Sequence, residues 1–201
     1  MSSPSKRTIS MKYKPFPTDL PLYFVTSVIA GHRSIFYSDE LALIPLSAIN
    51  FYAQKKLLNL YAFCLMPNHL HALIQTRQDV LIEKQMGEVH KYSAHKIVEH
   101  LQKVNQQQVL HFFQDKAETR IDRKHLVWAD AIAKPVLSEK YLYEVIEYIH
   151  NNPCKEHWRL VEDRADYRYS SAGFYDRGAQ PIIPVVDIRE VWFELGNQLS
   201  A

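Results

Sequence analysis

Glycine and cysteine are scarce in this chain, and it contains no long apolar run. Only 5 of the 201 residues are glycine, and neither GxGxxG nor GxxxxGKS/T occurs, which excludes the usual glycine-rich loops that cradle nucleotide phosphates. The two cysteines, Cys64 and Cys154, are too few for a disulfide framework or a cysteine-based zinc site. No apolar stretch reaches the ~18 residues of a membrane span, and none follows the first basic residues as in a signal peptide. We therefore expect a cytoplasmic protein with no membrane association.

The length and charge of the chain indicate one domain with a basic extension. A chain of 201 residues is close to the ~100–200 residues expected for a single domain. The net charge is only +2, but residues 1–20 carry four basic residues and one acidic residue, whereas the rest carries 20 basic and 21 acidic residues. Composition alone therefore gives little support for a nucleic-acid partner. We predict a flexible basic arm over residues 1–20, a domain over 21–175 and a C-terminal extension over 176–201.

Apolar periodicity predicts an α+β fold, because runs rich in β-branched and aromatic residues alternate with stretches of helical period. Strands are predicted over 21–29, 58–66, 69–75 and 131–137, and helices from Asp39 (capped by Ser38), over 80–104, over 138–152, near 169–175 and near 186–199. Residues 105–130 are polar and irregular, and we predict a loop there with at most a short strand. The order β-α-β-β-α-β-α is typical of a ferredoxin-like or RRM-like sandwich, an antiparallel sheet with helices on one face and one further helix.

Two histidines stand at alternate positions of the third predicted strand. His69 and His71 are two residues apart, so their side chains leave the same face of the sheet. Leu70, Ala72 and Ile74 supply the opposite, apolar face. Imidazoles at this spacing can bind one divalent metal ion together. A purely structural role is about as common for such a pair, and two histidines alone leave a metal site incomplete.

The predicted helix over 138–152 can supply the missing groups. Apolar residues at i, i+3, i+4 and i+7 form its buried stripe: Leu142, Val145, Ile146 and Ile149. Tyr148 and Asn152 lie beside this stripe and, four residues apart, face the same way. A phenol and a carboxamide so placed could present a nucleophile and a third metal ligand. The alternative is a tyrosine at the boundary of the apolar stripe and an asparagine that only ends the helix before Pro153.

Three ordered motifs resemble a known protein family. They are AFCLMPNHLH at residues 62–71, YIHNNPCK at 148–155 and DYRYSS at 166–171. This pattern is similar to the single-tyrosine HUH transposases of the insertion-sequence-200 type, and within them it is most similar to the REP-associated tyrosine transposases. The resemblance covers residues 20–175.

The resemblance implies a ferredoxin-like fold and a set of catalytic residues. By position, His69 and His71 are the metal-binding histidines, Asn152 takes the place of the third ligand, and Tyr148 is the nucleophile. The ion, Mg²⁺ or Mn²⁺, would polarise the scissile phosphate. Attack by Tyr148 would give a 5′-phosphotyrosine and a free 3′-hydroxyl, and a later 3′-hydroxyl could reverse the step. The resemblance thus implies DNA transposition, with single-stranded or hairpin DNA as partner, by a monomer or homodimer.

Contacts to DNA are less clearly indicated by the sequence. Lys84, Lys91 and His95 fall near one face of the predicted helix over 80–104 and could contact phosphates, as could Lys6 and Arg7 in the basic arm. A solvated helix and a solvated tail would account for the same residues. The alternative function is a catalytically inactive, domesticated module on the same fold that binds hairpin DNA or RNA.

Overall fold

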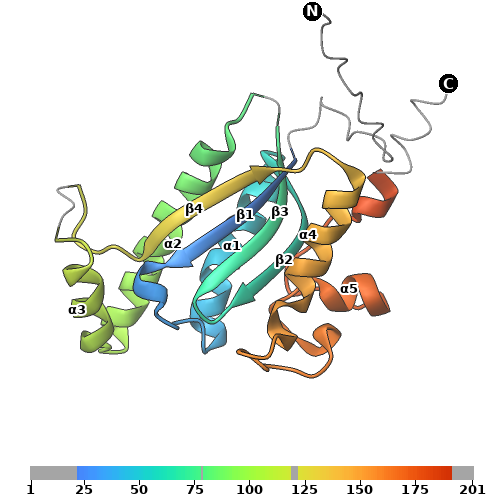
Figure 1. Ribbon diagram of the computed structural model, residues 1–201. Coiled ribbons are helices and arrows are strands. Elements are labelled where there is room, and N and C mark those ends of the chain that lie inside the picture. Colours follow the sequence, from blue (N-terminus) through green and yellow to red (C-terminus); the bar gives the residue numbers. More distant parts are fainter. Residues whose placement is uncertain (1–21, 78, 119–121, 192–201) are drawn as a thin grey trace, which may run out of the picture.

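The computed structural model describes residues 22–77, 79–118 and 122–191 (Figure 1). Its strands and helices are β1 (Leu22–Ile29), α1 (Asp39–Gln54), β2 (Leu58–Met66), β3 (His69–Thr76), α2 (Ile82–Lys103), α3 (Gln107–Asp115), β4 (Trp128–Pro135), α4 (Glu139–Asn151) and α5 (Ala172–Arg177). Three 3₁₀ turns accompany them: η1 (Ala30–His32), η2 (Asn152–Cys154) and η3 (Arg164–Asp166). A further helix begins at Ile188, and its described part ends at Val191.

The four strands form one antiparallel sheet in the order β2-β3-β1-β4. This order places β1 and β3 in the centre and leaves β2 and β4 at the edges. β4 ends on Pro135. Proline has no N–H to donate, so it would interrupt the hydrogen bonds of a central strand, but an edge strand tolerates it. The strand order and the connecting helices are those of a ferredoxin-like sandwich, so the predicted fold class is confirmed.

Helices cover both faces of the sheet, and each face has its own core (Figure 1). α1 and α2 pack on one face, where Val25, Phe63 and Leu70 are fully buried, and α3 packs against α2. α4 packs on the other face against β2 and β3, above Met66 and Leu73. The even-numbered positions of β3 therefore face α1 and α2, and the odd-numbered positions face α4.

Burial of the even positions explains why β3 keeps its register. Leu70, Ala72 and Ile74 are at most 1% exposed. A shift of one residue would turn these side chains toward α4 and move the two histidines into the larger core. Since burying one leucine or isoleucine contributes ~1.5–3 kcal/mol, that shift is strongly disfavoured. The predicted separation of a histidine face from an apolar face is confirmed.

The boundaries of α4 follow from its sequence as predicted. Ser138 is the N-cap residue, and its Oγ accepts a hydrogen bond from the backbone N–H of Tyr141 at 3.3 Å. The buried stripe contains the four predicted residues Leu142, Val145, Ile146 and Ile149. Pro153 lies in the following turn η2, where its ring and missing N–H prevent the α-helix from continuing. The stripe lays α4 against β2 and β3 and carries Tyr148 to the histidine face of the sheet.

The loop predicted over 105–130 is wrong in its first half, which contains the nine-residue helix α3. Only Val109, Leu110 and Phe113 of this helix are buried. So short a helix depends on burial against the rest of the protein, which a local pattern does not reveal. β4 also begins at Trp128, before the predicted start of the strand. Ser38 stands at the N-cap of α1 as predicted, but its side chain makes no capping hydrogen bond.

The last described segment packs onto both cores. Ile183 is buried on the α1 and α2 side and Ile188 beneath α4, while the N–H of Val186 donates to the carbonyl of Leu60 at 2.9 Å.

The predicted arm over 1–20 and residues 192–201 of the predicted extension lie outside the described residues. Within the described ranges, no helix has both the length and the apolarity needed to cross a membrane.

Candidate active site

His69 and His71 form a close pair on the face of β3 that α4 covers. Their ring centroids lie 4.7 Å apart, and the rings are nearly perpendicular at 77°. His71 is only 4% exposed, whereas His69 is half-buried. One ring is therefore enclosed by protein while the other reaches the solvent.

Each imidazole is held by a hydrogen bond at its Nδ1 atom. Nδ1 of His69 lies 2.6 Å from Oδ1 of Asn68, whose Nδ2 donates to the carbonyl of His32 at 2.9 Å. Because an amide oxygen can only accept, Nδ1 of His69 carries the proton. Nδ1 of His71 lies 3.0 Å from Oγ1 of Thr26, which can accept in the same way. Across the described residues neither Nε2 atom takes part in a hydrogen bond, so both are free to bind a ligand.

Burial keeps both imidazoles neutral. Loss of solvation, with a smaller contribution from the positive charge of Lys155, lowers the pKa of His69 to about 4 and that of His71 to about 3. The neutral imidazole is the form that binds a metal ion. The pair is thus ready to act as ligands throughout the neutral pH range.

Tyr148 lies directly against this histidine pair. Its ring centroid is 5.1 Å from that of His71 and 5.7 Å from that of Phe24, with both contacts edge-to-face. The residue is 44% exposed, so neighbouring rings hold the side chain while solvent and ligands can reach it. Tyr143, on the same helix, is more exposed and has no described ring contact with the histidines.

A pocket of about 470 Å³ opens beside Tyr148. Residues of β1, β3, β4 and α4 line it: Phe24, Thr26, His71, Ile132, Lys134, Tyr141, Glu144, Val145 and Tyr148. This volume lies within the ~300–1,000 Å³ typical of small-ligand sites. The walls are mainly aromatic and aliphatic, and Lys134 and Glu144 add one charge of each sign. A ligand in this pocket would reach His71 and Tyr148 together.

Asn152 and Lys155 lie next to Tyr148 and are bonded to each other. Nδ2 of Asn152 donates to the carbonyl of Tyr148 at 2.6 Å, and its Oδ1 accepts from Nζ of Lys155 at 3.0 Å. Nζ of Lys155 is also 3.7 Å from the centroid of the Tyr148 ring. The carboxamide is buried, with Asn152 3% exposed. A carbonyl oxygen has two lone pairs, so Oδ1 keeps one after accepting from Lys155.

The histidine pair is not completed by other acidic, cysteine or histidine side chains. In the part of the chain that the structure describes, no three such residues are arranged to hold a metal ion. A cation bound by His69 and His71 would therefore take its other ligands from an amide oxygen, water or a substrate phosphate. The buried carboxamide of Asn152, at the start of η2, offers such an oxygen.

The predicted DNA-contacting residues are not brought together with this site. Lys84, Lys91 and His95 are exposed on α2, which covers the face of the sheet opposite to Tyr148 (Figure 1). Lys6 and Arg7 lie outside the described residues. The structure therefore separates the catalytic candidates from the basic residues of α2.

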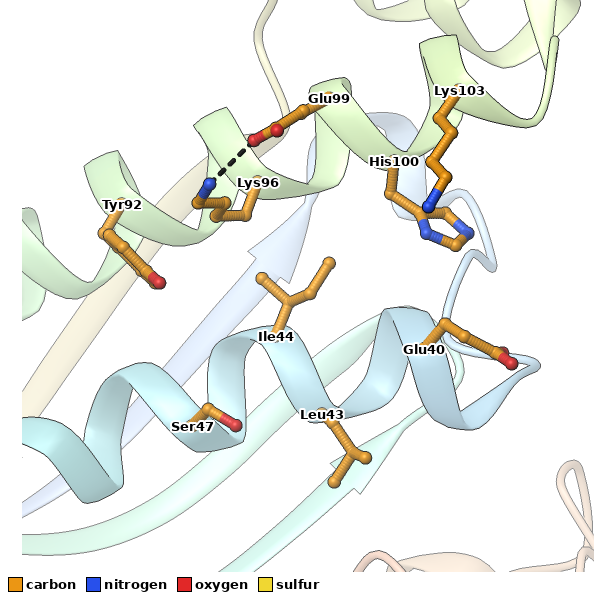
Figure 2. A pocket seen from close by; sticks show the side chains of 9 residues that line it. All are labelled: Glu40, Leu43, Ile44, Ser47, Tyr92, Lys96, Glu99, His100 and Lys103. Carbon is orange, nitrogen blue, oxygen red and sulfur yellow. Dashed lines mark hydrogen bonds and ion pairs between the residues drawn. The ribbon is translucent and has the colours of Figure 1, made fainter.

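A second hollow lies between α1 and α2, on the helical layer away from Tyr148 (Figure 2). Ile44 points from α1 into the gap between the two helices, and Nζ of Lys96 pairs with Glu99 at 2.8 Å. The charged side chains around this hollow carry both signs, including Glu40 and Lys103. They do not combine into a site for a cation or an anion, so the pocket beside Tyr148 is the candidate active site.

Sequence patterns missed the residues that hold the catalytic candidates in place. Thr26 meets His71 only because β1 pairs with β3 in this register. Asn68 directly precedes His69, and its position in the hairpin turn is the one signal that could have identified it. Lys155 ends the second motif, but its place in the chain does not show that η2 returns it to Tyr148.

Comparison with protein families matches the part of the chain that contains β1 to β3 and α1 to α3. Residues 23–119 match the family described as "Transposase IS200 like". This segment of the chain is thus similar to the IS200-like transposases. The matching segment includes His69 and His71 and ends before α4, so it does not include Tyr148. No curated protein matches the chain.

Two solved transposase structures are similar to this chain. A REP-associated tyrosine transposase bound to a REP hairpin is 16% identical with a TM-score of 0.57, over 89% of this chain and 93% of that chain. A putative transposase from Deinococcus radiodurans is 17% identical with a TM-score of 0.44, over 73% of this chain and 97% of that chain. The first likeness shows that the fold is shared over most of the chain.

Proposed function

We propose that this protein cuts and rejoins single-stranded DNA, with Tyr148 as nucleophile and a divalent metal ion held by His69 and His71. The observation that carries the proposal is the contact of the Tyr148 ring with the neutral histidine pair, 5.1 Å from the ring of His71 and beside a ligand-sized pocket. The match of residues 23–119 to the IS200-like transposases supports it. A phenol next to metal-binding imidazoles suits phosphoryl transfer through a tyrosine.

The site residues fit a divalent cation such as Mg²⁺ or Mn²⁺. His69 and His71 would hold it through Nε2, since Nδ1 of each ring is already engaged. Asn152 would supply an oxygen through the lone pair of Oδ1 that Lys155 does not use. When bound, such an ion polarises a phosphate oxygen and offsets the charge that develops on it.

Tyr148 would carry out the covalent step. Its Oη atom attacks the phosphorus of one phosphodiester, and the Oη–P bond forms as the P–O3′ bond breaks. The phenol proton passes to water and the departing 3′-oxygen takes a proton from water, which leaves a 5′-phosphotyrosine and a 3′-hydroxyl. Because the phosphotyrosine keeps the energy of the broken bond, attack by another 3′-hydroxyl joins the strands again.

The substrate would be unpaired DNA, for example the single strand next to a hairpin. Phe24 and Tyr141 line the pocket beside Tyr148, and aromatic side chains of this kind stack on unpaired bases. A paired nucleotide would have to leave its duplex to enter. The hairpin bound to the structurally similar REP-associated transposase favours the same class of substrate.

Incubation of the protein with labelled oligonucleotides and Mn²⁺, followed by denaturing electrophoresis, tests the proposal. Single-stranded DNA and a hairpin with an unpaired flank should give a covalent protein–DNA adduct that disappears in EDTA. A perfect duplex should give far less adduct. Tight hairpin binding without any adduct would favour the inactive binding module instead, and equal cutting of duplex and single strand would contradict the single-strand mechanism.

A further inference from the structure

Lys155 is folded back onto the proposed nucleophile. The turn η2 reverses the chain after α4, and the backbone N–H of Lys155 donates to the carbonyl of Asn152 at 3.2 Å. The side chain then returns toward α4, so that Nζ lies 3.7 Å from the centroid of the Tyr148 ring. Asn152 joins the two residues, because it accepts from Nζ of Lys155 and donates to the carbonyl of Tyr148. The ammonium is therefore held in place against the ring.

The charge of Lys155 has no counter-ion in the described part of the protein. None of the ion pairs among the described residues includes it. Partial burial lowers the pKa of the ammonium, and its charge also acts on His69 and His71, whose pKa values it lowers. An unpaired, partly desolvated cation costs stability unless a ligand supplies the missing negative charge. A neutral side chain of similar length would serve a purely structural role better.

The ammonium has the donors needed to bind a phosphate. It has three N–H bonds, of which the bond to Asn152 uses one. The other two N–H bonds lie beside Tyr148. Lys155 itself is not among the residues that line the pocket reaching His71. Lysine binds phosphates as a compact point charge, and a phosphodiester attacked by Tyr148 must come within reach of this charge.

We propose that Lys155 is a catalytic residue that binds a non-bridging oxygen of the scissile phosphate and stabilises the charge that grows there as the Oη–P bond forms. This inference rests on the proposed function of Tyr148 and extends it. Asn152 is the positioning residue that keeps the ammonium over the ring. Donors fixed in advance at a developing negative charge are among the most effective catalytic groups, because they need no rearrangement during the reaction.

Two substitutions of Lys155, compared in single-turnover formation of the covalent adduct, test the proposal. Lys155→Met keeps the aliphatic stem without the charge and should lower the rate constant on the order of 10²–10³-fold, the usual effect of removing one such donor. Lys155→Arg restores a charge and should recover part of the rate. Lys55→Met removes another lysine that lies over an aromatic ring, 5.6 Å from the centroid of Phe51 at the end of α1, and should react as the unchanged protein does.

A binding measurement separates phosphate recognition from a structural role. It measures binding of single-stranded DNA to the Tyr148→Phe protein in metal-free buffer. No cleavage occurs there, and only residues of the chain contribute to the affinity. Adding Lys155→Met should reduce the slope of log affinity against log salt concentration by ~0.7, the value for one phosphate contact on a single strand. Replacing the scissile phosphodiester with an uncharged methylphosphonate should weaken binding of Tyr148→Phe, but should not weaken binding of the double variant further.

The outcomes distinguish this inference from the proposed function. If the unchanged protein forms no adduct with any single-stranded DNA, the proposed function itself fails, and the role of Lys155 fails with it. If the unchanged protein forms the adduct and folded Lys155→Met forms it equally fast, only the role of Lys155 is overturned. A slow Lys155→Met variant with an unchanged salt slope and full sensitivity to the methylphosphonate also overturns it, because Lys155 would then act through structure alone.

Discussion

The hydroxyl of Thr26 lies 3.0 Å from Nδ1 of His71, directly across the pairing of the two central strands. This hydrogen bond fixes the orientation of the imidazole and leaves Nε2 as the nitrogen that can bind a metal ion. Partners of this kind orient the ligating imidazole and raise its basicity, so they strengthen its bond to a metal ion. The pair therefore provides a direct test of the metal site that leaves both proposed ligands intact.

Thr26→Val should weaken metal binding because it removes the hydroxyl and keeps the shape of the side chain. We expect the Mn²⁺ affinity to fall ~10–100-fold, measured by isothermal titration calorimetry. Thr76→Val on β3 is the matched control, since Oγ1 of Thr76 is buried and has no hydrogen-bond partner among the described residues. That control should keep its Mn²⁺ affinity and its stability. Equal affinities for the two variants would show that the hydrogen bond from Thr26 does not support metal binding by His71.

His71→Ala should abolish adduct formation and remove the stabilisation by metal. A ligand that binds only the folded state stabilises it, by ~2.7 kcal/mol at a concentration 100 times its dissociation constant. The unfolding temperature of the unchanged protein should therefore rise with Mn²⁺, whereas that of His71→Ala should not. His111→Ala, at an exposed position of α3, should behave like the unchanged protein. Normal cleavage by His71→Ala would contradict the assignment of the site.

Tyr148→Phe should form no covalent adduct but should still bind metal and single-stranded DNA. The change removes one hydroxyl and keeps the ring that contacts His71 and Phe24, so the packing of α4 is preserved. Tyr143→Phe, on the exposed side of the same helix, should cut at the normal rate. Mass spectrometry of the trapped adduct identifies the modified peptide. DNA joined to another tyrosine, or joined through a 3′-phosphate, would show that the proposed step is wrong.

The buried histidines should make the protein less stable in mild acid. Desolvation is the main cause that lowers the pKa of His69, His90 and His150 to about 4 and that of His71 to about 3. In the unfolded chain these groups titrate near ~6.5, so below that pH the unfolded state binds more protons than the folded state. The stability that the neutral histidines contribute is complete above pH ~6.5. It is lost as the pH falls toward the pKa values of these groups in the folded protein.

Urea unfolding in metal-free buffer between about pH 7 and pH 5 measures this dependence. The unfolding free energy should fall with decreasing pH by up to ~1.4 kcal/mol per pH unit for each histidine. His90→Gln removes one of these protons and should reduce the slope near pH 5 by about that amount. His111→Gln, which changes an exposed histidine, should leave the slope unchanged. A slope that His90→Gln does not alter would mean that His90 is protonated in the folded protein.

Much of the fold and of the candidate site could be predicted from the sequence because the relevant patterns are local. Alternation along β3 separates His69 and His71 from Leu70 and Ala72. Burial of the apolar side then fixes which face of the sheet the histidines occupy. In the same way, the helical stripe of α4 places Tyr148 and Asn152 on adjacent turns whatever the helix packs against. Element order then limits the connections between strands to a few, among which is the one observed.

Only the tertiary structure decided how these local patterns meet. It placed α4 on the histidine face of the sheet, Thr26 across from His71, and the ammonium of Lys155 over Tyr148. It also stabilised a helix over residues 107–115, which is too short to persist without burial against the rest of the protein. These contacts join segments far apart in the chain, and they depend on strand register and on the burial of whole elements. Local periodicity determines which face of an element is apolar, whereas packing determines what that element's other face will touch.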